Sequence, residues 1–104
     1  MAIIQRGEID AEIGGERRTL CLTLGALAEL EQRLQAGDLA GLAERFGNGR
    51  VSARDLTAII GAGLRGGGHA ISDDDLARLS IEGGIRGAAE IAARLLRATF
   101  GEAQ

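Results

Sequence analysis

Residues 8–24 read EIDAEIGGERRTLCLTL, and this stretch decides the N-terminal part of the fold. Apolar and polar residues alternate on both sides of Gly14-Gly15, as in two strands that each bury one face. Two adjacent glycines suit a type I′ turn, because both central positions of that turn need a positive φ. The stretch therefore predicts an antiparallel β-hairpin.

The glycine pair also predicts the register of this hairpin. With Gly14 and Gly15 as the loop, Ile9 faces Leu20 and Glu12 faces Arg17. One face then carries the apolar side chains, which are Ile9, Ala11, Ile13, Leu20 and Leu22. Because an isolated hairpin is only marginally stable in water, we expect this face to pack on helices.

After the hairpin the apolar residues recur with a helical period, and glycines separate the segments. Helices are expected after Thr23, Asp38, Ser52 and Ser72, and from about Ile85 to Phe100. The sequence after Ser52 resembles a capping box closed by Asp55. The expected core faces of the longer helices are Leu24, Leu27, Leu30 and Leu34; Leu39, Leu42, Ala43 and Phe46; Leu56, Ile59, Ile60 and Leu64; and Ala88, Ile91, Ala92, Leu95, Leu96 and Phe100.

The predicted fold class is α+β and mostly α, with an N-terminal two-stranded antiparallel β-hairpin packed on a bundle of four or five short helices. Residues 1–104 are expected to form a single domain, with the hairpin at about 7–23 and the helical part at about 24–100. A chain of this length buries roughly two-thirds of its unfolded surface. With 45% hydrophobic residues it has enough material for one core.

The composition argues against several classes of protein. A net charge of −3 disfavours a broad nucleic-acid surface. One cysteine, Cys21, allows no internal disulfide and suits the reducing cytoplasm. The sequence shows neither a signal peptide nor an apolar run of the roughly 20 residues that span a bilayer. We therefore expect a cytoplasmic protein that binds neither nucleic acid nor membrane.

Residues 61–66 read GAGLRG and match the G-x-G-x-x-G pattern of dinucleotide-binding proteins. That pattern functions only where it follows a strand and opens a helix, because the helix N-terminus must meet the pyrophosphate. Here it closes the helix predicted after Ser52. We therefore expect no cofactor at these glycines.

The most distinctive local string is LRGGGH, formed by Leu64, Arg65, Gly66, Gly67, Gly68 and His69. One interpretation is a helix C-terminus, with a glycine in the left-handed cap. The other is a loop that offers backbone groups, a guanidinium and an imidazole to a partner. Three glycines are more than a cap needs, so these six residues are our candidate partner-binding site.

No catalytic or metal-ligating set is evident. Zinc needs several Cys or His ligands, and this chain has one of each. Asp73, Asp74 and Asp75 lack the spacing of a calcium loop and suit the first turn of a helix. The sequence has no nucleophile elbow around which His69 could form a triad. We expect a non-enzymatic protein without a cofactor.

Five strings together resemble one family. They are RGE (6–8), LTLGALAELE (22–31), SARD (52–55), AGLRGGGH (62–69) and ATFG (98–101). In combination they look like the small tail assembly chaperones of gene transfer agents and siphophage-like tails. The resemblance implies a non-catalytic cytoplasmic factor that binds the tape measure protein and helps tail tube subunits assemble around it, so the tape measure and tail tube proteins are the expected partners.

A chaperone of this kind needs a surface for a client helix. We hypothesise a groove between the third and last predicted helices, bordered by Arg65 to His69. The alternatives are a structural tail component, such as a tube or connector subunit that self-associates through the hairpin edge, and a small DNA-binding regulatory domain. The mixed charge of the candidate helices disfavours the latter.

Overall fold

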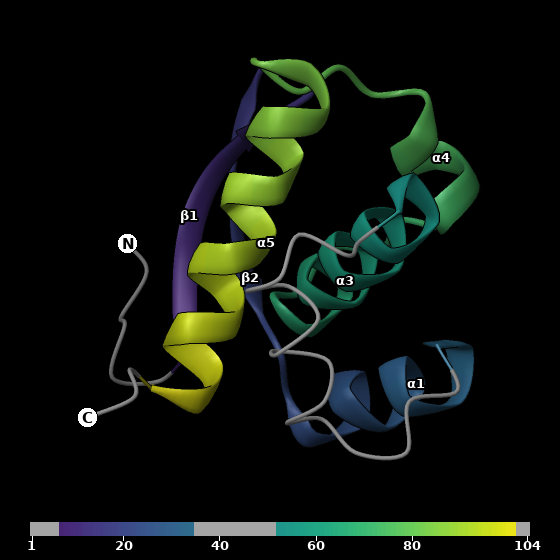
Figure 1. Ribbon diagram of the computed structural model, residues 1–104, viewed down its shortest axis with the longest axis vertical. Coiled ribbons are helices and arrows are strands. Elements are labelled where there is room, and N and C mark those ends of the chain that lie inside the picture. Colours follow the sequence, from purple (N-terminus) through teal and green to yellow (C-terminus); the bar gives the residue numbers. More distant parts are fainter. Residues whose placement is uncertain (1–6, 35–51, 102–104) are drawn as a thin grey trace.

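The structure is a computed structural model, and it describes residues 7–34 and 52–101 (Figure 1). Within these residues, two strands and four helices follow one another: β1 (Glu8–Ile13), β2 (Glu16–Cys21), α1 (Leu24–Leu34), α3 (Ala53–Gly66), α4 (Asp73–Ala77) and α5 (Gly84–Phe100). The predicted fold class, a two-stranded hairpin on a mostly helical body, is confirmed. The helix expected after Asp38 lies outside the described residues.

The hairpin has the predicted register. Ile9 is opposite Leu20 and Glu12 is opposite Arg17. Gly14 and Gly15 both have positive φ, at 65° and 80°, as a type I′ turn requires. The apolar face is buried against the helices, since Ile9, Ala11, Ile13, Leu20 and Leu22 are each at most 7% exposed.

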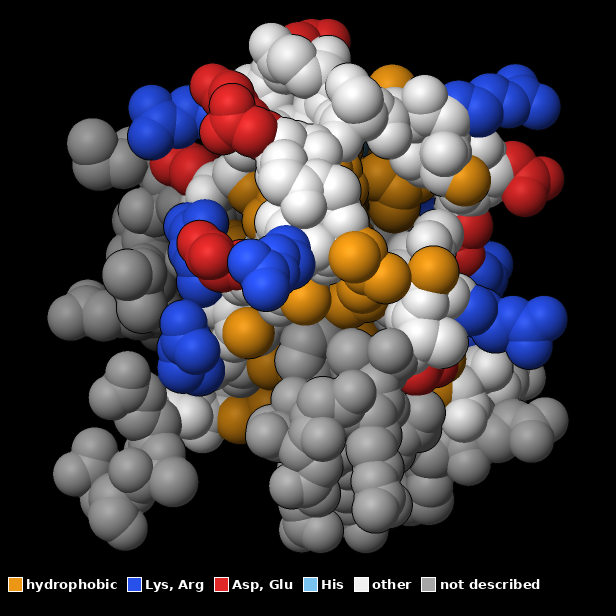
Figure 2. Space-filling model, turned by 45° about the horizontal axis from the view of Figure 1, so that its top comes forward, with side chains coloured by type: hydrophobic (Ala, Val, Ile, Leu, Met, Phe, Trp, Pro, Cys, Tyr) orange, Lys and Arg blue, Asp and Glu red, His pale blue; other side chains and the backbone are white. Residues whose placement is uncertain are grey.

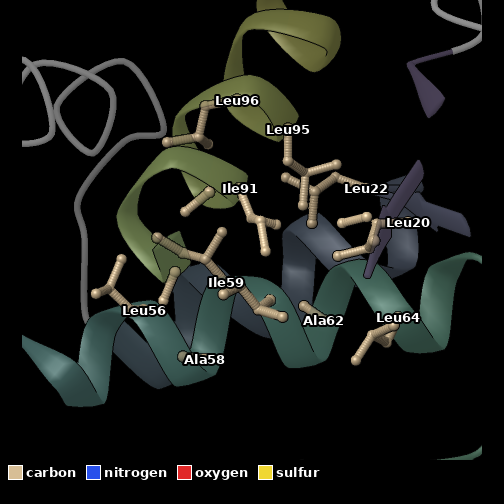
Figure 3. Close-up of a cluster of buried hydrophobic side chains, with 14 of the residues drawn as sticks. Leu20, Leu22, Leu56, Ala58, Ile59, Ala62, Leu64, Ile91, Leu95 and Leu96 are labelled. Atoms are coloured by element: carbon tan, nitrogen blue, oxygen red, sulfur yellow. The ribbon is translucent and has the colours of Figure 1, made fainter. Parts of the chain in front are cut away.

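Helix α3 is the centre of the fold, because it contacts β2, α1, α4 and α5. A helix surrounded on so many sides needs small residues where its neighbours approach, and α3 provides them at Ala58, Gly61, Ala62 and Gly63. Its larger side chains fill the core together with those of β2 and α5 (Figure 3). The fully buried ones include Ile59, Ile60 and Leu64.

Three helix starts are capped at the residues that the sequence indicated. Thr23 Oγ1 accepts a hydrogen bond of 3.1 Å from the backbone N–H of Ala26. Ser52 and Asp55 form the reciprocal bonds of a capping box. Ser72 Oγ accepts from the N–H of Asp75, also at 3.1 Å. The caps therefore fix where α1, α3 and α4 begin.

Two expected core residues are not in the core. Leu24 is 86% exposed and Phe100 is 44% exposed. At 100° per residue, Leu24 lies about 120° around α1 from the buried Leu30, and Ala26 occupies the inward position instead. Phe100 is the last residue of α5, at the edge of the core.

Candidate functional site

An open apolar groove of about 230 Å³ lies between α3, α4 and the start of α5. Its lining is almost wholly aliphatic: Ala53, Leu56, Thr57, Ile60, Leu76, Ala77, Leu79, Ile81, Gly84, Ile85 and Ala88. Ile85 stands at its edge and is 62% exposed. Figure 2 shows a face of the molecule on which hydrophobic side chains are exposed between charged ones.

The segment between α4 and α5 forms one wall of the groove, and local chemistry fixes its path. The N–H of Gly14 donates to the carbonyl of Ser80 at 2.8 Å, which ties this segment to the hairpin turn. Gly83 and Gly84 then reverse the chain with φ values of 87° and 60°. Residues that carry a Cβ rarely adopt two such backbone conformations in succession. The glycine pair thus directs α5 back along the hairpin.

The hypothesised groove between the third and last helices is present, but its border differs from the one expected. Its α3 lining residues are Ala53, Leu56, Thr57 and Ile60, toward the N-terminal end of that helix. Arg65 lies at the opposite end of that helix. Leu79 and Ile81 also line the groove, and the sequence pattern did not indicate them. They follow a helix of only five residues. Such a short helix left no periodic pattern to indicate which way these side chains face.

The six residues of the LRGGGH string have distinct places in the fold. Leu64 is fully buried. Gly66 and Gly67 lie against the outer edge of β2, so that a Cβ on either would overlap the carbonyl oxygen of Cys21 or Thr19. These positions account for most of the string without a ligand. Its role in binding a partner stays a prediction.

The last two residues of the string complete the helix end. Gly68 has φ of 98°. Its N–H donates to the carbonyl of Arg65 at 3.1 Å, and that of His69 donates to the carbonyl of Leu64 at 2.9 Å. This is the Schellman arrangement, which satisfies the last carbonyls of a helix. The three glycines therefore serve two purposes, close approach and a left-handed cap.

Arg65 belongs to a ring of four charges that joins α1, α3 and α4. It pairs with Glu29 and, at 3.0 Å, with Asp73, while Arg33 pairs with the same two carboxylates. Burial by itself would lower the pKa of the Arg65 guanidinium. The hydrogen bonds to Glu29 and Asp73 and the negative charges of these two carboxylates outweigh burial, so the pKa of Arg65 lies above its ordinary value. Gly61 leaves room for the ring, because a Cβ there would overlap Asp73 Oδ1.

Both strands of the hairpin already have contacts along their outer edges. On β1, the carbonyl of Asp10 accepts a 2.8 Å hydrogen bond from the Arg94 guanidinium. On β2, the carbonyls of Thr19 and Cys21 face the glycines that end α3. Pairing with a further strand would have to displace these contacts. The apolar groove is therefore a more accessible binding surface than the hairpin edge.

The G-x-G-x-x-G glycines lie inside α3 and not at a helix N-terminus. Among residues 7–34 and 52–101, no group of three or more His, Cys, Asp or Glu could hold a metal ion. Within the same ranges, no helix has the length and apolarity to cross a membrane.

Residues 6–102 match the model of a protein family described as "Phage tail tube protein, GTA-gp10". No curated protein and no solved structure matches this chain.

Proposed function

Because this chain belongs to the GTA-gp10 family of phage tail tube proteins, we propose that it is a structural, non-catalytic subunit of a phage-like tail. The match over residues 6–102 carries this proposal, since it spans almost the whole chain. The expected partners are other tail proteins and further copies of itself. We further propose that the protein acts in the cytoplasm, where tails assemble.

The open groove supports a role in assembly. A structural subunit acts by burying surface against its neighbours, and the groove supplies aliphatic surface for such a contact. Aromatic anchors are scarce in this chain, which has two phenylalanines and neither Trp nor Tyr. Aliphatic packing therefore has to provide most of the contact energy.

Size-exclusion chromatography with light scattering, over a series of rising concentrations, tests the proposal. A tube subunit is expected to step from small species to a large discrete oligomer, and negative-stain electron microscopy should then show rings or short tubes. A chain that stays monomeric at every concentration, alone and mixed with the other proteins of its tail cluster, would contradict a structural role.

A tail assembly chaperone is the second candidate, as the sequence resemblance implies. The groove favours it too, because an aliphatic groove of about 230 Å³ can take side chains of an amphipathic client helix. Co-expression with fragments of the tape measure protein distinguishes the two roles. A chaperone should raise the soluble yield of a fragment while remaining small itself, whereas a tube subunit should leave that yield unchanged.

A further inference from the structure

The segment that joins α3 to α5 has few buried side chains. It comprises residues 69–82 and includes α4, and we call it the strap. Figure 1 shows it leaving the end of α3, turning through α4 and crossing to the start of α5. Within the strap only Leu76 is buried, and the remaining residues are half-buried or exposed. Because a helix of five residues is not stable by itself, contacts with the rest of the fold must hold the strap in place.

Glycines with a positive φ lie at both ends of the strap. Gly68 directly precedes it with a φ of 98°, and Gly83 and Gly84 directly follow it with φ values of 87° and 60°. A Cβ at Gly68 or at Gly84 would have no atom within 4 Å, so neither position is packed against a neighbour on that side. Glycine absorbs large changes of φ and ψ at low cost, and hinges are often built from such small residues. The strap therefore lies between two candidate hinges.

The first half of the strap is fastened by charge. The strap contributes Asp73 to the four-charge ring, where it pairs with Arg65 at 3.0 Å and with Arg33. Arg65 also donates to the carbonyl of Ile71 in the strap at 2.9 Å. The paired side chains are all partly exposed, and each ion pair of this kind contributes little to stability. The ring therefore favours the closed position of the strap without locking it.

The second half of the strap is fastened to the hairpin turn. The N–H of Gly14 donates to the carbonyl of Ser80 at 2.8 Å. Leu79 lies against the same turn, since a Cβ at Gly14 would stand 3.1 Å from its Cδ2. Withdrawal of one buried leucine, Leu76, costs far less than exposure of the whole core. Displacement of the strap is therefore a smaller event than global unfolding.

We propose that the strap opens and closes as one unit, hinged at its terminal glycines and latched by Asp73, while the hairpin, α3 and α5 remain folded. Opening withdraws Leu76 from the groove that it lines together with Leu56 and Ile60 of α3. The latch thereby sets how much aliphatic surface of α3 is exposed. This conformational device belongs to the single chain and goes beyond either of the tail roles proposed above.

Hydrogen exchange of the full chain, resolved by residue with NMR spectroscopy, tests the opening. The N–H groups of Leu76 and Leu79 donate to carbonyls inside the strap, and the N–H of Gly14 donates to the strap from outside. One opening event should expose all three amides. Their protection factors should therefore agree, and should be about tenfold or more below those in the middle of α3 and α5. If Leu76 is protected as strongly as the core, or if the exchange of Gly14 does not follow that of Leu76, the proposal is overturned.

Two alanine variants in α3 separate opening of the strap from global unfolding. A Cβ at Gly61 would overlap Asp73 Oδ1, so Gly61→Ala disturbs the latch and should speed exchange in the strap about fivefold, the scale of a partly exposed ion pair. A Cβ at Gly63 would press on Leu95 of α5. Gly63→Ala destabilises the closed and the open form alike, so it should speed exchange in the core and leave the strap unchanged. The opposite pattern in either variant contradicts an independent, latched strap.

A second pair of variants tests the charge of the latch. Asp73→Asn keeps the size of the side chain but removes its charge, and should again speed exchange in the strap about fivefold. Asp74→Asn is the matched control, because Asp74 lies in the same first turn of α4, is exposed and makes no ion pair with the described residues. The control should change the exchange rate far less. Equal rates in the two folded variants would show that the ring is not the latch.

Discussion

Gly63 lies directly against Leu95: a Cβ atom at Gly63 would stand 2.6 Å from Cδ2 of the leucine and 3.3 Å from the side chain of Leu20. Real Cβ atoms do not come that close to a carbon of a neighbouring residue. The glycine thus sets the distance at which α3 meets both α5 and the hairpin. What resembles a nucleotide-binding motif in the sequence is a contact between three elements of the core.

Gly63→Ala is expected to lower the free energy of unfolding by up to about 2 kcal/mol. The overpacking cost of ~1–3 kcal/mol exceeds the helix-propensity gain of Ala over Gly, which is ~1 kcal/mol. Gly25→Ala in α1 is the matched control, because its Cβ would meet nothing closer than 3.9 Å. The control should be neutral or stabilising. Urea denaturation measures both, and a stabilised Gly63→Ala would contradict the close packing of α3.

Gly66→Ala and Gly68→Ala should both lower the free energy of unfolding, by different amounts and for different reasons. At Gly66 the new methyl group would overlap the backbone carbonyl of Cys21, which cannot rotate away, so a loss of about 2 kcal/mol is expected. At Gly68 there is open space, and only the positive φ opposes the change, at ~1 kcal/mol. If thermal unfolding shows equal losses of stability for the two variants, the close approach of Gly66 to β2 does not contribute to stability.

Removal of Arg65 and Asp73, singly and together, should reveal a coupling between them. Arg65→Gln, Asp73→Asn and the double variant form a cycle, and about 0.5–1 kcal/mol of interaction is expected for a partly exposed pair. Because 1 M salt shortens the Debye length to ~3 Å, the coupling should shrink there. Additive losses, unchanged by salt, would mean that the ring does not help to hold α3 and α4 together.

Ser52→Ala should cost about 1 kcal/mol, the usual value of an N-cap. The Ser52 hydroxyl accepts the N–H of Asp55 at 3.1 Å, and the Asp55 carboxylate accepts the N–H of Ser52 at 3.1 Å. Ser80→Ala is the control, since Ser80 is exposed and only its carbonyl accepts a hydrogen bond in the described structure. If both variants unfold at the same urea concentration, the cap contributes nothing.

The thiol of Cys21 is expected to react slowly in the folded protein. Burial raises its pKa, and the negative charge of Glu8 raises it further. Since the thiolate is the reactive form, iodoacetamide at pH 8 should alkylate the folded chain several-fold more slowly than the urea-unfolded chain. Equal rates would contradict the raised pKa.

The same shift predicts how stability depends on pH. A pKa that is higher in the folded state means that the folded chain holds its proton longer. The stabilisation that the Cys21 thiol contributes is therefore fully present below its pKa in the unfolded chain. It is lost as the pH rises through its pKa in the folded chain. Cys21→Ser should flatten that decline in a series of urea denaturation curves above pH 8.

Local chemistry let the sequence determine the hairpin and the helix starts. Gly14 and Gly15 fix the turn and hence the register, and a slip of one residue would turn every apolar side chain to solvent. Thr23, Ser52 and Ser72 each accept a hydrogen bond from a backbone N–H only three residues away. Features with so short a range can be derived from the order of the residues alone.

Packing between distant segments decided the rest. The sequence could not show that Leu24 faces solvent, because its spacing fits a helical stripe and only the position of α3 selects Ala26 and Leu30 as the inward residues. Nor could it show that Gly61, Gly63 and Gly66 each meet a different neighbour. The groove arises where α3, α4 and α5 fail to close on one another, and that depends on the tertiary arrangement of side chains far apart in the chain.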